Sequence, residues 1–198
     1  MLTERLQKQI EFIVEVDKVK HVFRQNMLID GSRHENDAEH SWHLALMGFL
    51  LAEYANTDRL DVTRVMKMVL IHDLVEIDAG DTFCYDEKGA LDKGERECKA
   101  ADRLFNILPA DQAQEFRALW EEFERMDTPE AKFAAALDRF QPLLQNYHTT
   151  GDTTWAKHKV TSAKVYQRNQ HIKDGATELW EYANAVIEDC IAKGLLSK

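Results

Sequence analysis

Helical periodicity runs through nearly the whole 198-residue chain, and it restricts the fold more than any other feature of the sequence. Apolar residues recur three or four positions apart, beginning with Leu6, Ile10, Ile13 and Val14. Only 8 glycines and 3 prolines interrupt this pattern, and no repeat or convincing strand is present. We therefore predict an all-α helical bundle that forms a single domain over residues 1–198, with its core at about residues 10–170.

Turn and capping residues divide the pattern into separate helices. We expect a first helix that continues to about Phe23, then a polar loop from Asn26 to Asp37. Asp37 and Asp61 would cap the second and third helices, and the third should end before Gly80. The segment from Thr82 to Gly94 reads as a loop over the site. Further helices are expected at 95–108, 110–126, 129–148 (after Thr128, with Gly151 as its break), 155–172 and 175–193 (before Gly194).

Composition excludes several classes of function. The formal net charge is −10, so the chain lacks the broad positive field that binds nucleic acid polymers. The sequence contains neither an apolar signal segment nor a run long enough to span a bilayer. Three scattered cysteines without a CxxC pair are typical of reduced thiols, and we expect a cytoplasmic protein.

His72 and Asp73 follow the apolar run at 69–71, late in a strongly periodic helix. A buried aspartate beside a histidine is costly unless its charge is compensated, and a divalent cation compensates it efficiently. Neighbouring side chains on a helix point about 100° apart. The remaining ligands of such a cation must therefore come from other helices.

His40 and Asp138 occupy comparable positions. His40 shares a helix face with Leu44 and Met47, and Asp138 follows the small apolar run at 134–137. Taken alone, His40 would more often be a hydrogen-bonded core histidine. All four polar residues at inward helical positions favour one metal site. Two imidazoles and two carboxylates suit Mn, Fe, Co, Ni or Zn better than Ca or Mg.

Two further carboxylates point to catalysis. Glu76 follows His72 by four residues and Asp73 by three, so it should share their face and could orient or deprotonate a water molecule. Asp81 follows Gly80 at the expected helix end, where the helix dipole does not favour a carboxylate. It would handle the proton of a leaving group or bind a sugar hydroxyl, and an ordinary turn residue is the alternative.

At these residues the chain resembles the HD-domain phosphohydrolase superfamily. The segment from His72 to Asp81 is similar to the HDxxExxxGD signature of the 5′-deoxynucleotidase branch. The segment from Arg33 to Ser41 is similar to the first motif of that branch. The resemblance implies an all-helical fold, a divalent metal, hydrolysis of nucleoside 5′-monophosphates with a preference for the 2′-deoxy sugar, and a homodimer.

The resemblance also implies roles for individual residues. Glu76 and Asp81 correspond to the catalytic carboxylates, while Arg24 and Arg33 match arginines that bind substrate. Some relatives carry a tryptophan after the first arginine, but this chain has Gln25 there, a departure that concerns discrimination of the sugar.

Two other functions are also compatible with the sequence. One is a hydrolase of nucleoside di- or triphosphates or of an alarmone. The other is a metal-stabilised ligand-binding module without turnover, against which the presence of Glu76 and Asp81 argues. The basic segment 155–173, which includes Arg168, would form a solvated face, a subunit contact or the rim of the pocket.

Overall fold

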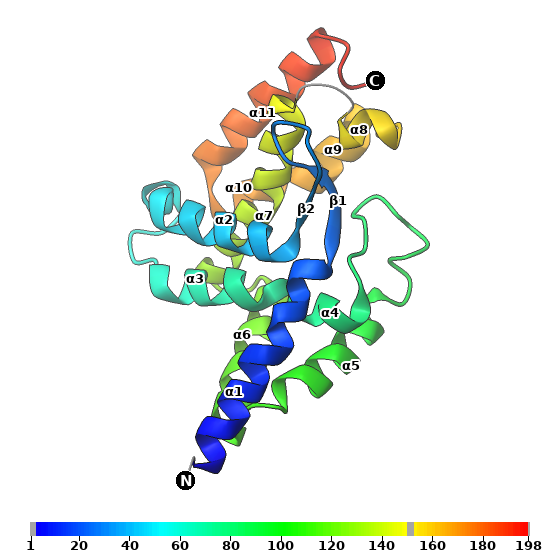
Figure 1. Ribbon diagram of the computed structural model, residues 1–198. Coiled ribbons are helices and arrows are strands. Elements are labelled where there is room, and N and C mark those ends of the chain that lie inside the picture. The colour runs from blue at the N-terminus through cyan, green and yellow to red at the C-terminus, as the bar shows by residue number, and fades with distance from the viewer. Residues whose placement is uncertain (1–2, 150–152, 198) are drawn as a thin grey trace.

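A computed structural model describes residues 3–149 and 153–197. Its α-helices are α1 (Glu4–Val16), α2 (Asp37–Leu50), α3 (Val62–Ile71), α4 (Glu76–Ala79), α5 (Lys93–Phe105), α6 (Ala110–Arg125), α7 (Pro129–His148), α8 (Thr154–Lys157), α9 (Ser162–Asn169), α10 (Ile172–Gly175) and α11 (Thr177–Ala192) (Figure 1). Short 3-10 helices are η1 (Asp17–His21), η2 (Ala52–Tyr54) and η3 (His72–Val75). The predicted helical fold is confirmed.

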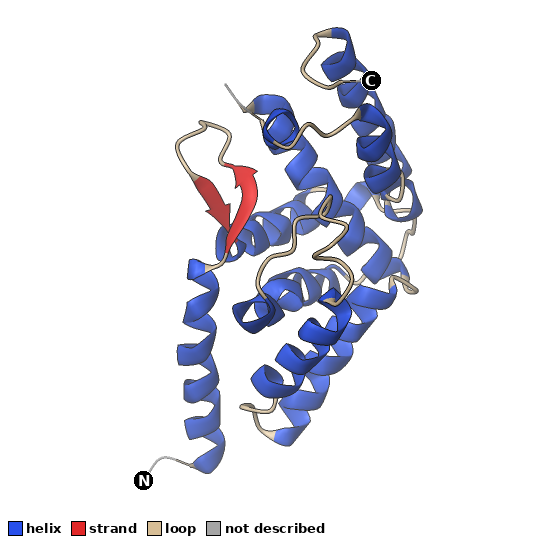
Figure 2. Ribbon diagram, turned by 90° about the vertical axis from the view of Figure 1, so that its right-hand side faces the viewer, coloured by secondary structure: helices blue, strands red, loops and turns tan. Residues whose placement is uncertain are grey.

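A two-stranded antiparallel hairpin interrupts the helical pattern between α1 and α2 (Figure 2). Strand β1 (Phe23–Met27) pairs with β2 (His34–Asn36), and the register is irregular between the two ends. The connecting turn contains Gly31 at φ 70°, a conformation that glycine adopts without steric cost. The predicted loop over 26–37 is therefore wrong for these strands, because the backbone ladder pairs polar residues as readily as apolar ones.

The start of α2 lies one residue earlier than predicted. Asn36 is the N-cap: its side chain accepts a hydrogen bond from the Glu39 backbone N–H at 3.0 Å, and the Glu39 carboxylate accepts one from the Asn36 N–H at 3.2 Å. Asp37 consequently falls in the first turn and is fully buried. Asp61 and Thr128 cap α3 and α7 as predicted.

Helix α7 lies at the centre of the molecule and packs against α2, α3, α6, α10 and α11. One large core cluster forms around it and contains Leu44, Val65, Leu137 and Ile187 from four of these helices. A smaller cluster joins α1, α5 and α6. The two termini lie at opposite ends of the molecule (Figure 1).

The predicted helix at 155–172 is divided into α8, α9 and α10. The chain leaves the helical path at Lys159, which has φ 51°, and Thr161 then caps α9. Gly194 follows α11 at φ 70°, in agreement with its predicted role as a stop. Gly151 lies outside the described residues. Within the part of the chain that the structure describes, every helix is too short or too polar to cross a lipid bilayer.

Candidate metal centre

The chain changes its helical winding at the His72-Asp73 doublet. Helix α3 ends at Ile71, η3 follows, and α4 begins at Glu76. A 3-10 helix has three residues per turn, so side chains three positions apart lie on one face. Carboxylate oxygens of Asp73, Glu76 and the buried Asp37 accordingly lie within 4.8 Å of one another.

Both histidines are held through Nδ1. The Nδ1 atom of His72 is 2.9 Å from the carbonyl oxygen of Val69, and that of His40 is 3.1 Å from Oε1 of Gln141. Each acceptor requires the N–H on Nδ1, which leaves the Nε2 lone pair free to bind a cation. The Nε2 atom of His72 is buried and has no hydrogen-bond partner.

Asp73 and Asp138 face these two Nε2 atoms. Oδ1 of Asp138 is 3.2 Å from Nε2 of His40 and 3.8 Å from Nε2 of His72. Oδ1 of Asp73 is 3.2 Å from Nε2 of His72. The four predicted metal ligands therefore meet, although His40 and Asp138 are 98 positions apart in the sequence.

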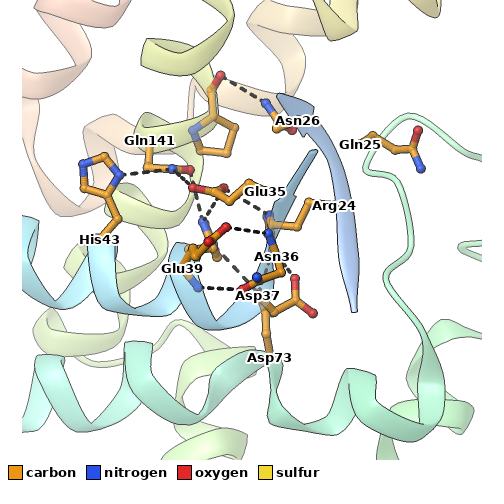
Figure 3. A network of polar contacts seen from close by, with 12 residues as sticks. Arg24, Gln25, Asn26, Glu35, Asn36, Asp37, Glu39, His43, Asp73 and Gln141 are labelled. Carbon is orange, nitrogen blue, oxygen red and sulfur yellow. Dashed lines mark hydrogen bonds and ion pairs between the residues drawn. The ribbon is translucent and has the colours of Figure 1, made fainter. Parts of the chain in front are cut away.

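A chain of hydrogen bonds holds Nδ1 of His40 in place, and Figure 3 labels its members Gln141, Glu35 and His43. Gln141, on α7, accepts from His40 and donates from its Nε2 to Oε1 of Glu35 at 2.8 Å. Its Nε2 also lies 3.4 Å from Nδ1 of His43. Glu35 belongs to β2, so this chain links the hairpin, α2 and α7.

Arg24 of β1 lies among the carboxylates. Its Nη1 is 2.7 Å from Asp73 and 3.4 Å from Asp37, and other guanidinium nitrogens are 4.0 Å from Glu35 and Asp138. Burial opposes the charge of Arg24, but the surrounding aspartates outweigh it and raise the pKa of Arg24. Gln25, the next residue, lies apart from this network (Figure 3).

The remaining carboxyls of the cluster hold their protons strongly. Burial, followed by the negative charge of Asp73, raises the pKa of Glu76 well above its ordinary value and raises that of Asp37 to about 7. Burial is also the main cause that raises the pKa of Asp81. Arg24 alone does not balance this negative charge. A bound cation would lower these pKa values.

The donor set fits a divalent cation. Nε2 of His72, Oδ2 of Asp37 and Oε2 of Glu76 are buried atoms without hydrogen-bond partners. Donor atoms of His40, His72 and Asp73 lie within 4.8 Å of one another, and so do carboxylate oxygens of Asp37, Asp73 and Glu76. Only the first of these two sets contains imidazole nitrogens, so it suits a transition metal better.

A cavity opens beside these donors and receives side chains from β1, η3, α7, α9 and the loop after α4. Glu76, Asp81 and Arg24 line it, in agreement with their predicted places. Arg33 does not: it is half exposed and pairs with the Glu39 carboxylate at 2.5 Å. The structure thus brings together all the predicted site residues except Arg33.

Several residues of the site were missed or left undecided by sequence reasoning. Gln141 carries a detectable signal, because it follows Asp138 by three positions and shares its helix face. Glu35 lies within the motif that resembles the deoxynucleotidase branch. Arg168 belongs to the basic segment, whose place the sequence leaves open, and it lines the cavity together with Arg139.

A family model described as an HD domain matches residues 16–180. The chain belongs to the HD domain family. This match includes every proposed metal ligand and both candidate catalytic carboxylates.

Among curated HD-domain relatives, the human 5′-deoxynucleotidase HDDC2 is 31% identical over 137 residues, which cover 69% of this chain and 65% of that protein. The Dictyostelium discoideum 5′-deoxynucleotidase HDDC2 is 30% identical over 143 residues, covering 70% of this chain and 75% of that protein. The chain thus spans just under two thirds of the length of the human relative.

Solved structures confirm the HD-domain fold. A predicted metal-dependent phosphohydrolase from Magnetospirillum magnetotacticum MS-1 has a TM-score of 0.94 and 52% identity, with 100% of both chains covered. A conserved hypothetical protein from Pyrococcus furiosus has a TM-score of 0.63 and 26% identity, covering 91% of this chain and 97% of that one.

Proposed function

We propose that this HD-domain protein is a metal-dependent phosphohydrolase that removes phosphate from (deoxy)nucleoside 5′-monophosphates. One observation carries the proposal: the buried His40, His72 and Asp73, together with the partly buried Asp138, adjoin a cavity that Glu76 and Asp81 also line. The names of the curated relatives support the class of substrate. The bacterial structure with 52% identity supports the class of reaction.

The metal would be held by His40, His72, Asp73 and Asp138. We expect Mn, Co, Ni, Fe or Zn, since mixed nitrogen and oxygen donors suit these ions. A divalent cation supplies charge neutralisation to a phosphate group and lowers the pKa of water. The chain contributes the orientation of both imidazoles, through Gln141 and the Val69 carbonyl.

Glu76 is the best-placed proton acceptor. Its side chain lines the cavity next to the metal donors. With a cation bound, which lowers the pKa of Glu76, the ionised carboxylate would take a proton from an attacking water. As the water oxygen bonds to phosphorus, the bond to the 5′ oxygen breaks, and Asp81 would protonate that oxygen or bind a sugar hydroxyl. Arg24 would add positive charge, because phosphoryl transfer depends mainly on positioning and neutralisation.

The same protein would act as a homodimer. Four large apolar side chains form a solvent-facing stripe on α2: Trp42, Leu46, Phe49 and Leu50. Their spacing of i, i+4, i+7 and i+8 places them on one face of the helix. A contiguous apolar face of this kind is typical of a subunit contact. Trp42 is 64% exposed.

The proposed activity is tested on protein stripped of metal and then supplied with Mn, Co, Ni, Zn or Mg. Deoxy- and ribonucleoside mono-, di- and triphosphates are assayed with the wild type, Asp73→Ala and Glu76→Gln. We expect inorganic phosphate from monophosphates, loss of metal from Asp73→Ala, and a loss of turnover of about 10²–10⁴-fold with metal retained in Glu76→Gln. The exposed Glu53→Gln is the matched control and should behave as the wild type.

Other outcomes would redirect the assignment. Release of pyrophosphate or triphosphate would identify a polyphosphate hydrolase instead. Binding of metal without turnover of any nucleotide would indicate a ligand-binding module. If Glu76→Gln lost its metal, Glu76 would be a ligand and not the proton acceptor.

A further inference from the structure

Cationic side chains line the cavity at four places: Arg24, Lys93, Arg139 and Arg168. Two of them are well compensated by carboxylates. Arg24 has four carboxylates within 4.0 Å, and Nζ of Lys93 is 3.0 Å from the carboxylate of Glu97. The positive charge left for a ligand therefore resides on the two other arginines.

Arg139 is the less compensated of the two. It follows Asp138 on α7, and its Nη1 donates to the carbonyl oxygen of Ala135 at 2.9 Å. Nη2 lies 3.5 Å from the sulfur of Met126, and Nε is buried without a hydrogen-bond partner. Within the described ranges, no carboxylate oxygen comes within the 4.0 Å of an ion pair with Arg139. A partly buried guanidinium that is not ion-paired with a carboxylate keeps its charge available for a ligand, so this arrangement favours an anion.

Arg168 reaches the same region from α9. Its Nη2 is 3.6 Å from Oδ2 of Asp138, and its side chain is 38% exposed. Asp138 is also a proposed metal ligand, so its charge would be shared with the cation. Arg139 and Arg168 line the same cavity, and both lie next to Asp138, the former in sequence and the latter in space. Two neighbouring like charges increase the attraction for an anion between them.

We propose that Arg139 and Arg168 form an anion-binding subsite beside the metal donors and hold the non-bridging oxygens of the substrate's phosphate group. The identity of the anion rests on the proposed function. Asp138 lies between the guanidinium groups of Arg24 and Arg168, at 4.0 and 3.6 Å. A phosphate group adjacent to the metal is therefore within reach of Arg168. Guanidinium groups bind phosphate through paired N–H donors, which an amine does not reproduce.

The test is the affinity for inorganic phosphate, measured by calorimetric titration of the full chain loaded with Mn. The variants are Arg168→Gln, Arg168→Lys and Arg139→Gln, and the control is Arg125→Gln, an exposed arginine on α6. We expect Arg168→Gln and Arg139→Gln to weaken phosphate binding about 10- to 100-fold. Arg168→Lys should bind phosphate more tightly than Arg168→Gln but more weakly than the wild type, because lysine restores the positive charge without the paired N–H donors of a guanidinium. Arg125→Gln should match the wild type.

Metal content is measured before each titration. The proposal is overturned if Arg168→Gln binds phosphate within twofold of the wild type, or if its weaker binding follows from loss of Mn. Arg168 is partly exposed, so its variants keep the test valid even if Arg139→Gln fails to fold.

The outcome separates the subsite from the proposed function. Phosphate binding that depends on both arginines, without turnover of any nucleotide, would support the subsite and contradict only the proposed activity. Nucleotide hydrolysis by a wild type whose phosphate affinity neither arginine affects would contradict only the subsite.

Discussion

At the scale of single residues, a histidine binds a metal well only when its other ring nitrogen is fixed, and the two histidines achieve this differently. His72 uses a main-chain carbonyl one helical turn away, which no substitution removes. His40 depends on one side chain, Gln141, which is itself held by Glu35. The second arrangement can be tested by mutation.

Replacing Gln141 by leucine keeps most of the volume but removes the acceptor for Nδ1 of His40. We expect Gln141→Leu to bind Mn or Zn about 10- to 100-fold more weakly, measured by competition with a chromogenic chelator. Gln170→Leu is the control, because Gln170 is exposed and distant in the sequence. An affinity of Gln141→Leu within twofold of the wild type would show that Gln141 does not orient the ligand.

The four proposed metal ligands could be selected from the sequence because each lies on the inward side of a regular periodic segment. Helical periodicity does not predict which neighbouring side chain a charged residue pairs with, and this limits the prediction for the arginines. Arg33 belongs to a motif that resembles the deoxynucleotidase branch, yet it pairs with Glu39 at the surface, and its role in substrate binding stays a prediction. Arg168 could not be placed, because the division of the segment into α8 and α9 decides which way it points.

At the scale of secondary structure elements, the hairpin is the main departure from the sequence prediction. Its strands are polar, so neither a period of two nor of 3.6 is visible in them. The Asp30-Gly31 pair is a turn signal, but its flanks lack the alternating apolar residues that would complete a hairpin pattern. The consequence is functional, since the strands bring Arg24 and Glu35 to the metal site.

Helix α10 packs closely against α7 at Gly175, where the main chains of the two helices approach each other more closely than at the other glycines described. A Cβ atom added at Gly175 would come within 3.0 Å of the Lys132 carbonyl group and the Phe133 Cα, and main-chain atoms cannot move aside freely. We expect Gly175→Ala to lower the free energy of unfolding by about 1–3 kcal/mol, measured by urea denaturation. Gly94→Ala, where the new methyl group meets no atom within 4 Å, should be neutral or slightly stabilising. Equal stability of the two variants would contradict this account of the α7–α10 contact.

Arg96 of α5 holds both ends of the loop over residues 81–92. Its guanidinium donates to the carbonyl oxygens of Ala79 and Gly89, the latter at 3.0 Å, and to the hydroxyl of Thr82 at 3.1 Å. A lysine offers a single nitrogen and cannot make all these contacts.

We therefore expect Arg96→Lys to loosen the loop and to increase tryptic cleavage after Lys88 about tenfold, with metal content unchanged. Arg125→Lys is the matched control on the surface of α6. Cleavage at the wild-type rate in Arg96→Lys would show that other contacts hold the loop.

At the scale of the whole molecule, the exposed stripe on α2 bears on assembly. The chain carries a net charge of −10, so two copies repel each other unless an apolar contact outweighs the repulsion. We expect sedimentation to give about twice the monomer mass of 22.9 kDa, and Phe49→Asp to shift the protein toward monomer. Ile13→Asp, on the exposed face of α1, tests whether the contact is specific to α2. A wild type that remains monomeric at high concentration would refute the homodimer.

One divalent ion would join three separate parts of the fold, namely α2, the His72-Asp73 doublet and α7. An anomalous difference map from crystals of the Mn-loaded protein tests this. We predict one dominant peak at about 2.0–2.2 Å from Nε2 of His40 and His72 and from carboxylate oxygens of Asp73 and Asp138. A dominant peak held by the carboxylates of Asp37, Asp73 and Glu76 alone, away from both imidazoles, would show that the histidines are not ligands.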